Sequence, residues 1–259
     1  MLFSKLFRKS EAQAFSCQRG KLTVRGCVYG ETDEPQEAVI LCHGFLANQS
    51  TVTAYAKVIA GLGFRAFTFD FCGGGLGVKS DGKSEDMTVL TEVRDLRAVI
   101  QYVSSLPGIT AVSLLGCSQG GFVSAMTAKQ LGAEKIRRLM LFYPALCIPD
   151  DARKGQMISY RFDPEKIPDL LGRVPMRLGG DYARAVIHMD PFDEIRGYAG
   201  PTLLLHGTAD DLVNISYSRR AKDCFSQCEY HEIMGGGHGF TGKYDAEACE
   251  YLKRFLKEI

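Results

Sequence analysis

The segment Gly-Cys-Ser-Gln-Gly at residues 116–120 has the residue types and spacing that can present a serine as a nucleophile. An apolar run at residues 111–115 predicts a short buried strand before it, and a helical pattern of small and apolar residues resumes at Phe122. A turn this tight between a strand and a helix leaves no room for side chains beside the serine, so glycine must flank it. The spacing therefore predicts that the hydroxyl of Ser118 is exposed at the end of the strand.

A serine hydroxyl is a weak nucleophile until a base takes its proton and an acid holds that base in the correct tautomer. His238 is the best placed of the five histidines, because it lies in a glycine-rich loop after an apolar strand and before the last predicted helix. His43 and His206 follow predicted strands and are expected to make structural hydrogen bonds. The acid should follow the preceding strand, where Asp210 and Asp211 are adjacent and only one can face His238.

The Gly-Cys-Ser-Gln-Gly segment alone is weak evidence for a nucleophilic serine, but the order in which the acid and the base follow it in the sequence strengthens the prediction. With either aspartate, the residues follow in the order Ser, Asp, His, which this strand–turn–helix setting requires. The negative oxygen formed during attack on a carbonyl also needs two backbone N–H donors. We expect one from Gln119, directly after the serine, and one from Phe45 in a His-Gly-Phe turn that follows another apolar run.

The elements that position these residues alternate along the chain. Strands are predicted at residues 22–29, 38–42, 65–70, 111–115, 136–143, 201–205 and 229–233, and helices at 51–62, 87–106, from 122, and at 245–259. The first strand alternates apolar and polar residues, as an antiparallel edge strand does. The pattern predicts an α/β fold with a mostly parallel sheet covered by helices on both faces, and a binding site beyond the carboxyl ends of the strands.

We expect residues 1–259 to form a single domain with a small inserted lid at about residues 147–193. This segment contains five prolines, is too long for an ordinary connection and is too apolar for a linker. The alternative is a mobile loop. The chain contains no internal repeat, low-complexity tract or second full domain.

Composition excludes several classes of function. The 31 basic and 30 acidic residues nearly cancel, which argues against nucleic acid or an anionic membrane as a partner. No run is apolar and long enough to span a membrane, so we expect no stable membrane insertion. Residues 1–9 are basic and amphipathic but lack signal-peptide features, so they form either a membrane-surface contact or a loosely held end.

Nine cysteines, an odd number, predict reduced thiols and a cytoplasmic location, because several lie within apolar strand patterns. Cys224, Cys228 and His231 could be read as zinc ligands, but no fourth ligand lies at metal spacing, so we expect no metal site.

With these residues in hand, the chain resembles the α/β-hydrolase superfamily over essentially its whole length, and within it the bacterial cinnamoyl and feruloyl esterases. The matching stretches are residues 43–48, 69–71, 80–82, 87–88, 116–120, 206–210 and 237–240, with 150–156, 167–169 and 179–182 in the predicted lid. The resemblance helps to favour Asp210 over Asp211 as the acid. Asp211 is then expected to cap a helix that starts at Val213.

The resemblance also implies substrate-binding residues in the lid. By motif position, Asp151 and Tyr182 would reach the phenolic hydroxyls of a hydroxycinnamoyl group, and Gln156 is the nearest counterpart of a glutamine in that group. The alternative for Asp151 and Tyr182 is ordinary packing and capping within the lid. The chain departs from the family at residues 72–77, a longer and more glycine-rich loop that could reshape the mouth of the site.

The sequence thus predicts a serine carboxylesterase that hydrolyses a small-molecule ester through an acyl-enzyme, with Ser118, Asp210 and His238 as the triad. It predicts no metal or organic cofactor, and it allows a homodimer. The alternatives are a monoacylglycerol lipase or lysophospholipase-like enzyme, a serine peptidase, and a catalytically silent binding protein of the same fold. A lipase would need a long apolar groove, for which the lid offers Met157, Ile158, Leu170, Leu171 and Met176.

Overall fold

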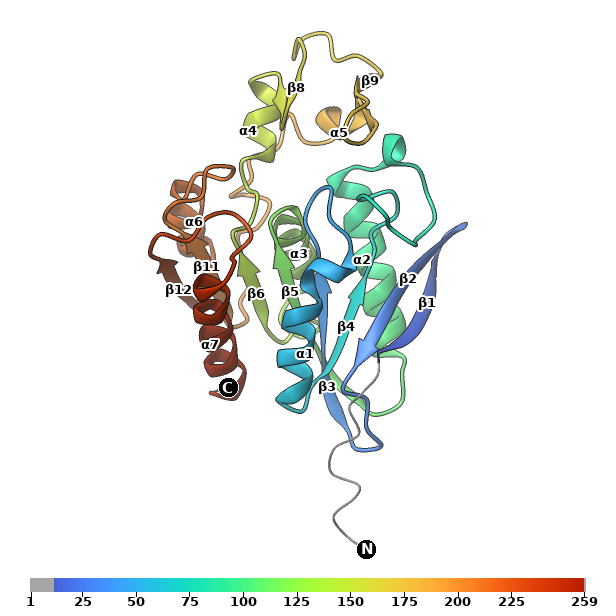
Figure 1. The fold of residues 1–259 in the computed structure, drawn as a ribbon, viewed down its shortest axis with the longest axis vertical. Helices are drawn as coiled ribbons and strands as arrows, with labels where there is room; N and C mark the ends of the chain where they lie inside the picture. Colours follow the sequence, from blue (N-terminus) through green and yellow to red (C-terminus); the bar gives the residue numbers. More distant parts are fainter. Residues whose placement is uncertain (1–11, 259) are drawn as a thin grey trace, which may run out of the picture.

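The computed structural model describes residues 12–258, and its centre is an eight-stranded sheet (Figure 1). In spatial order its strands are β1 (Gln13–Arg19), β2 (Leu22–Tyr29), β4 (Arg65–Phe69), β3 (Gln36–Cys42), β5 (Ile109–Cys117), β6 (Leu139–Phe142), β11 (Thr202–Gly207) and β12 (Cys228–Ile233). All neighbours from β4 to β12 pair in parallel, whereas β1 and β2 are antiparallel to each other and β2 is antiparallel to β4. The predicted mostly parallel α/β sheet is confirmed.

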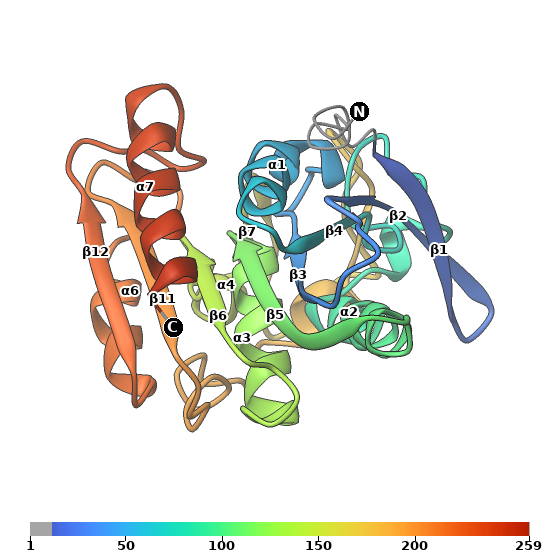
Figure 2. The ribbon, with the colours of Figure 1, turned by 90° about the horizontal axis from the view of Figure 1, so that it is seen from below.

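Helices cover both faces of this sheet (Figure 2). One core cluster packs α2 (Val89–Ser104) and α3 (Gln119–Leu131) against one face. A second cluster packs α1 (Thr53–Gly61) and α7 (Lys243–Lys257) against the other. The central strands are buried from both sides, which explains why they read as continuous apolar runs in the sequence. Short helices are η1 (Gln49–Val52), η2 (Ser84–Asp86), α6 (Ser216–Ala221) and η3 (Lys222–Cys224).

The antiparallel side of the sheet differs from the prediction. Strand β2 has the predicted bounds, but it pairs with β1 on one side and β4 on the other, so it is not an edge strand. The true edge, β1, is absent from the predicted elements, because only Phe15 and Cys17 among its residues are buried. The predicted segment at residues 1–9 lies outside the described residues.

The segment between β6 and β11 forms small elements of its own. They are α4 (Ile148–Arg153), the hairpin of β7 (Gln156–Met157) and β8 (Tyr160–Arg161), the paired strands β9 (Leu170–Gly172) and β10 (Leu178–Gly179), and α5 (Asp181–Arg184). Figure 1 shows this segment beyond the carboxyl ends of the central strands, where a ligand is expected in such sheets. Its role as a lid stays a prediction, and we call it the lid segment.

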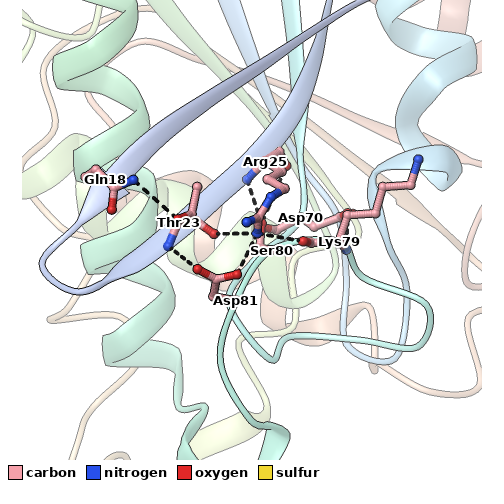
Figure 3. Close-up of polar contacts among 7 residues, drawn as sticks. All are labelled: Gln18, Thr23, Arg25, Asp70, Lys79, Ser80 and Asp81. Atoms are coloured by element: carbon pink, nitrogen blue, oxygen red, sulfur yellow. Dashed lines mark hydrogen bonds and ion pairs between the residues drawn. The ribbon is translucent and has the colours of Figure 1, made fainter.

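The chain after β4 is anchored to β2 by a polar cluster (Figure 3). Thr23 N–H donates to Asp81 Oδ2 at 2.8 Å, and Asp81 N–H donates to the Thr23 carbonyl at 2.9 Å. Arg25 N–H donates to Ser80 Oγ at 2.8 Å, and that hydroxyl donates to the Asp70 carbonyl at 2.5 Å. These bonds fix both ends of the glycine-rich loop at residues 72–77.

At the opposite end of the sheet, a buried charge cluster joins β3 to β5 and β6. The Arg138 guanidinium donates to both carboxylate oxygens of Glu37 at 2.5 Å, and Ser113 Oγ donates to the same carboxylate at 2.5 Å. The side chains of Arg138 and Glu37 are only 3% and 10% exposed. Removal of Glu37 would therefore leave the buried Arg138 guanidinium without this carboxylate.

We expect Glu37→Ala to lower the free energy of unfolding by about 3–5 kcal/mol, because Arg138 would lose its carboxylate partner in the interior. Urea-induced unfolding checks this value. The matched control is Glu250→Ala, which removes an exposed carboxylate paired with Lys253 and should leave the unfolding curve nearly unchanged. Equal, small effects of both substitutions would contradict the prediction.

Candidate active site

The turn between β5 and α3 is as tight as the sequence predicts. Ser118 lies between the last residue of β5 and the first of α3, with φ 53° and ψ −122°. A β-carbon on Gly116 would lie 2.3 Å from the carbonyl oxygen of Gly120, and one on Gly120 would lie 2.4 Å from that of His43. Both contacts are with backbone atoms that cannot move aside. Glycine is therefore required on both sides of Ser118, whose strained backbone is held by its surroundings.

The structure brings the three predicted triad residues together from three separate loops. His238 Nε2 lies 2.9 Å from Ser118 Oγ, and His238 Nδ1 lies 2.8 Å from Asp210 Oδ2. Because a carboxylate only accepts hydrogen bonds, Nδ1 carries the proton and Nε2 accepts from the serine hydroxyl. The His238 side chain is 16% exposed and Ser118 is half-buried, so a small molecule can reach both. This geometry can transfer the serine proton to the imidazole.

Asp210 is held as a buried anion by several donors. Its Oδ1 accepts from the N–H groups of Leu212 at 3.0 Å and Val213 at 2.8 Å. Its Oδ2 lies 3.2 Å from His206 Nε2, in addition to His238. Burial alone would raise the pKa of Asp210, but these hydrogen bonds outweigh it and hold the pKa well below its ordinary value.

The expectation for Asp211 is wrong. No helix starts at Val213, since α6 begins at Ser216, and Asp211 is exposed. Oδ1 of Asp210 instead accepts from the backbone N–H groups of Leu212 and Val213 in this turn. One carboxylate therefore shapes this turn with one oxygen and contacts His238 with the other.

His43 and His206 make structural hydrogen bonds, as predicted. Both are fully buried. His206 accepts from Ser218 Oγ at Nδ1, at 2.6 Å, which leaves the proton on Nε2 facing Asp210. His43 accepts from Phe71 N–H at Nε2, at 3.1 Å, and donates from Nδ1 to the Gly44 carbonyl at 2.8 Å. Burial lowers the pKa of His43, which favours its neutral form.

The two expected oxyanion donors lie beside the serine. Gly44 is packed so closely that a β-carbon on it would lie 3.0 Å from Cβ of Ser118, and Phe45 follows directly. Gln119 is the first residue of α3, where a backbone N–H has no helical acceptor. Within residues 12–258, no hydrogen-bond acceptor contacts the backbone N–H of Phe45 or of Gln119. Both donors are therefore available to an external oxygen.

The glycine-rich loop supports the turn that carries Phe45. Gly75 forms a β-bridge with Leu46, and Leu76 N–H donates to the Leu46 carbonyl at 3.2 Å. A β-carbon on Gly75 would lie 1.6 Å from the carbonyl oxygen of Ala47. Only glycine permits this approach. The glycine-rich loop at residues 72–77, where the chain departs from the family pattern, therefore fixes the backbone next to the predicted oxyanion hole.

The three residues expected to bind substrate differ in their surroundings. Tyr182 is buried, and its hydroxyl donates to the side-chain oxygen of Gln119. Asp151 is half-buried in α4, and burial raises the pKa of its carboxyl. The amide of Gln156 bonds within its own hairpin, to Arg161 and to the Ile158 carbonyl. In the described part of the chain, only Tyr182 of these three bonds to a residue beside the serine.

Two neighbours of the site were not predicted. The ring of Tyr143 meets His238 edge-on, with centroids 4.8 Å apart. Glu92 is buried in α2 and accepts from Gln119 Nε2 at 2.8 Å. The signal for Glu92 was an acidic residue at a core position of an amphipathic helix, between Val89 and Val93. Tyr143 carried no comparable signal.

The cysteines are all free thiols, and seven of the nine are buried. Residues 12–258 contain no group of three His, Cys, Asp or Glu side chains arranged as a metal site. His231 instead stacks on Tyr251, and its Nε2 lies 2.7 Å from Glu229 Oε1. Over the same residues, no helix has the length and apolar character needed to cross a membrane.

Residues 33–182 match the model of a protein family described as serine aminopeptidase, S33. The chain belongs to this family. Est1E from Butyrivibrio proteoclasticus, solved with bound ferulic acid, is similar in structure, with a TM-score of 0.87 and 26% sequence identity over 94% of this chain and 98% of that chain. The fold prediction and the resemblance to α/β-hydrolase esterases are confirmed by these matches, and the chain is a hydrolase of the α/β-hydrolase superfamily.

Other similar structures share the fold at lower identity. A monoacylglycerol lipase from Paleococcus ferrophilus has a TM-score of 0.69 at 20% identity, over 95% of this chain and 98% of that chain. DcsB in complex with a substrate analogue has a TM-score of 0.77 at 20% identity, over 96% of this chain and 99% of that chain. Comparison with curated protein sequences gives no significant match.

We expect Gly120→Ala to destabilise the protein by about 1–3 kcal/mol or more, because the new methyl would overlap the His43 and Cys42 carbonyl oxygens. Thermal unfolding measures this loss. Gly61→Ala is the matched control, since Gly61 also lies in a helix but a β-carbon there meets nothing within 4 Å. It should stabilise by up to about 1 kcal/mol, and destabilisation of equal size in both variants would refute the steric account.

Proposed function

We propose that this hydrolase cleaves carboxylic esters by nucleophilic catalysis at Ser118. The observation that carries the proposal is the continuous hydrogen-bonded chain from Ser118 through His238 to Asp210, three residues that follow the carboxyl ends of β5, β12 and β11. These three groups can form and resolve an acyl-enzyme without further reactants except water. The family match and the similarity to Est1E support this chemistry.

The geometry assigns a role to each group. Ser118 Oγ attacks the ester carbonyl while its proton moves to His238 Nε2, and Asp210 stabilises the charged imidazolium. The carbonyl oxygen becomes negative and is bound by the N–H groups of Phe45 and Gln119. His238 then gives its proton to the departing alcohol, which leaves an acyl group on Ser118. Water attacks that acyl group, with His238 again acting as base, and the acid is released.

We propose a small ester as substrate, with a hydroxycinnamoyl ester as the first candidate, because Est1E binds ferulic acid and is similar over nearly the whole chain. An acyl ester of glycerol is the alternative. Three of the five apolar side chains considered for a long acyl groove, Met157, Leu171 and Met176, are buried within the core cluster. This packing favours a short or aromatic acyl group. The free, mostly buried thiols support a cytoplasmic location.

The test is steady-state hydrolysis of p-nitrophenyl acetate, butyrate and laurate, methyl ferulate and a monoacylglycerol. We expect the highest kcat/KM with methyl ferulate, and we expect Ser118→Ala to lose turnover of every ester, because it removes the hydroxyl that His238 contacts. A preference for laurate or the glyceride would support ester hydrolysis but contradict the proposal that the substrate is a hydroxycinnamoyl ester. Wild-type activity in Ser118→Ala, or no reaction of the native protein with a fluorophosphonate probe, would overturn the proposal.

We expect Asp210→Asn to lower kcat by about 10⁴-fold, because an amide in this position would stabilise the wrong tautomer of His238. Asp211→Asn is the matched control, since Asp211 is exposed and should leave kcat unchanged. Rates with p-nitrophenyl butyrate measure both variants. The assignment of the acid would be wrong if Asp211→Asn lost activity and Asp210→Asn kept it.

A further inference from the structure

Tyr182 in α5 touches both residues that carry the expected oxyanion donors. Its ring packs against the ring of Phe45, with centroids 5.5 Å apart and a tilt of 46°. Its hydroxyl donates to the side-chain oxygen of Gln119. Phe45 follows β3 and Gln119 follows β5, so a single side chain from the lid segment spans the two halves of the oxyanion hole.

The side-chain amide of Gln119 is fixed at both ends. Its oxygen accepts from Tyr182, and its nitrogen donates to Glu92 Oε2 at 2.8 Å. Tyr182, Gln119 and Glu92 are only 2%, 1% and 1% exposed, so water does not compete for these bonds. These two bonds together fix the orientation of the amide in the interior.

The body of the protein determines where α5 places Tyr182. Strand β10, directly before α5, packs so closely on η2 that a β-carbon on Gly179 would lie 2.1 Å from the Glu85 carbonyl oxygen. Arg177 Nε lies 2.7 Å from Glu85 Oε1 at the same contact. These contacts fix β10 on η2 directly before the helix that carries Tyr182.

We propose that Tyr182 is a positioning residue of the reaction, because it fixes Phe45 and Gln119, whose N–H groups form the proposed oxyanion hole. Glu92 assists by accepting the other hydrogen bond of the Gln119 side chain. The inference rests on the proposed function, and it gives Tyr182 a role separate from the phenol binding that the family resemblance implied. The hydrogen of the Tyr182 hydroxyl is donated to Gln119, and its ring is packed on Phe45.

The first test is Tyr182→Phe, which keeps the ring but removes the bond to Gln119. We expect kcat for p-nitrophenyl acetate to fall about tenfold while KM stays within about twofold, a smaller loss than removal of an oxyanion donor itself. The acetyl group carries no phenolic hydroxyl, so a role in binding the phenol of a hydroxycinnamoyl group cannot produce this loss. The matched control is Tyr198→Phe, because Tyr198 is 1% exposed and its hydroxyl donates to the Ile136 carbonyl at 2.7 Å, away from the triad. It should lower the melting temperature but leave kcat unchanged.

The second test concerns Glu92. Glu92→Leu should lower kcat for acetate as Tyr182→Phe does, whereas Glu92→Gln keeps an acceptor for the Gln119 amide and should keep kcat within about twofold of wild type. The double variant Tyr182→Phe/Glu92→Leu should lose less than the product of the two single losses, because both act on the same amide.

Three results would overturn the inference. One is Tyr182→Phe with wild-type kcat for acetate and a raised KM for methyl ferulate alone, which would make Tyr182 a substrate contact. Another is an equal loss of kcat in Tyr198→Phe, which would make the effect one of general stability. The third is a multiplicative loss in the double variant. Failure of the proposed function is separate, since it would appear as full activity in Ser118→Ala.

Discussion

The close approach of α3 to the end of β3 is the constraint on which the site depends. Gly120 lies so near the carbonyl oxygens of His43 and Cys42 that no side chain fits, and the chain reverses at Ser118 with positive φ. The same approach places the turn after β3 beside the serine, which brings Phe45 close to Gln119. One close contact between backbones thus places the proposed nucleophile beside both expected oxyanion donors.

The fold and the meeting of Ser118, Asp210 and His238 could be predicted because their signals are local. Buried parallel strands read as apolar runs, and the Gly-x-Ser-x-Gly turn and the Gly-His-Gly loop fall at the ends of such runs. The support around the triad could not be predicted, because it consists of contacts between distant segments. The bonds of Tyr182 and Glu92 to Gln119 span 63 and 27 residues, and neither residue type implies such a partner by itself. Strand β1 was missed for a different reason, since it buries only two side chains.

In the turn after β11, the sequence correctly placed one aspartate beside His238 but misassigned its neighbour. Asp210 was expected to contact His238, and Asp211 was expected to cap a helix. A carboxylate has two oxygens with separate lone pairs, and Asp210 uses Oδ1 for the turn and Oδ2 for His238. The bonds within the turn therefore orient the same carboxylate that contacts the imidazole, and Asp211 is exposed to solvent.

Two buried carboxyl groups in the site, those of Asp210 and Glu92, have pKa values shifted in opposite directions. Hydrogen bonds from His206, His238 and Val213 hold the pKa of Asp210 low despite its burial, so it is an anion that can stabilise an imidazolium. Glu92 accepts from the uncharged amide of Gln119, and burial raises its pKa well above the ordinary value. An anion behind Gln119 would repel the oxygen that becomes negative in the transition state, whereas a neutral acid would not. Hydrogen bonds thus favour the charged form of Asp210 beside His238, whereas burial favours the neutral form of Glu92 beside Gln119.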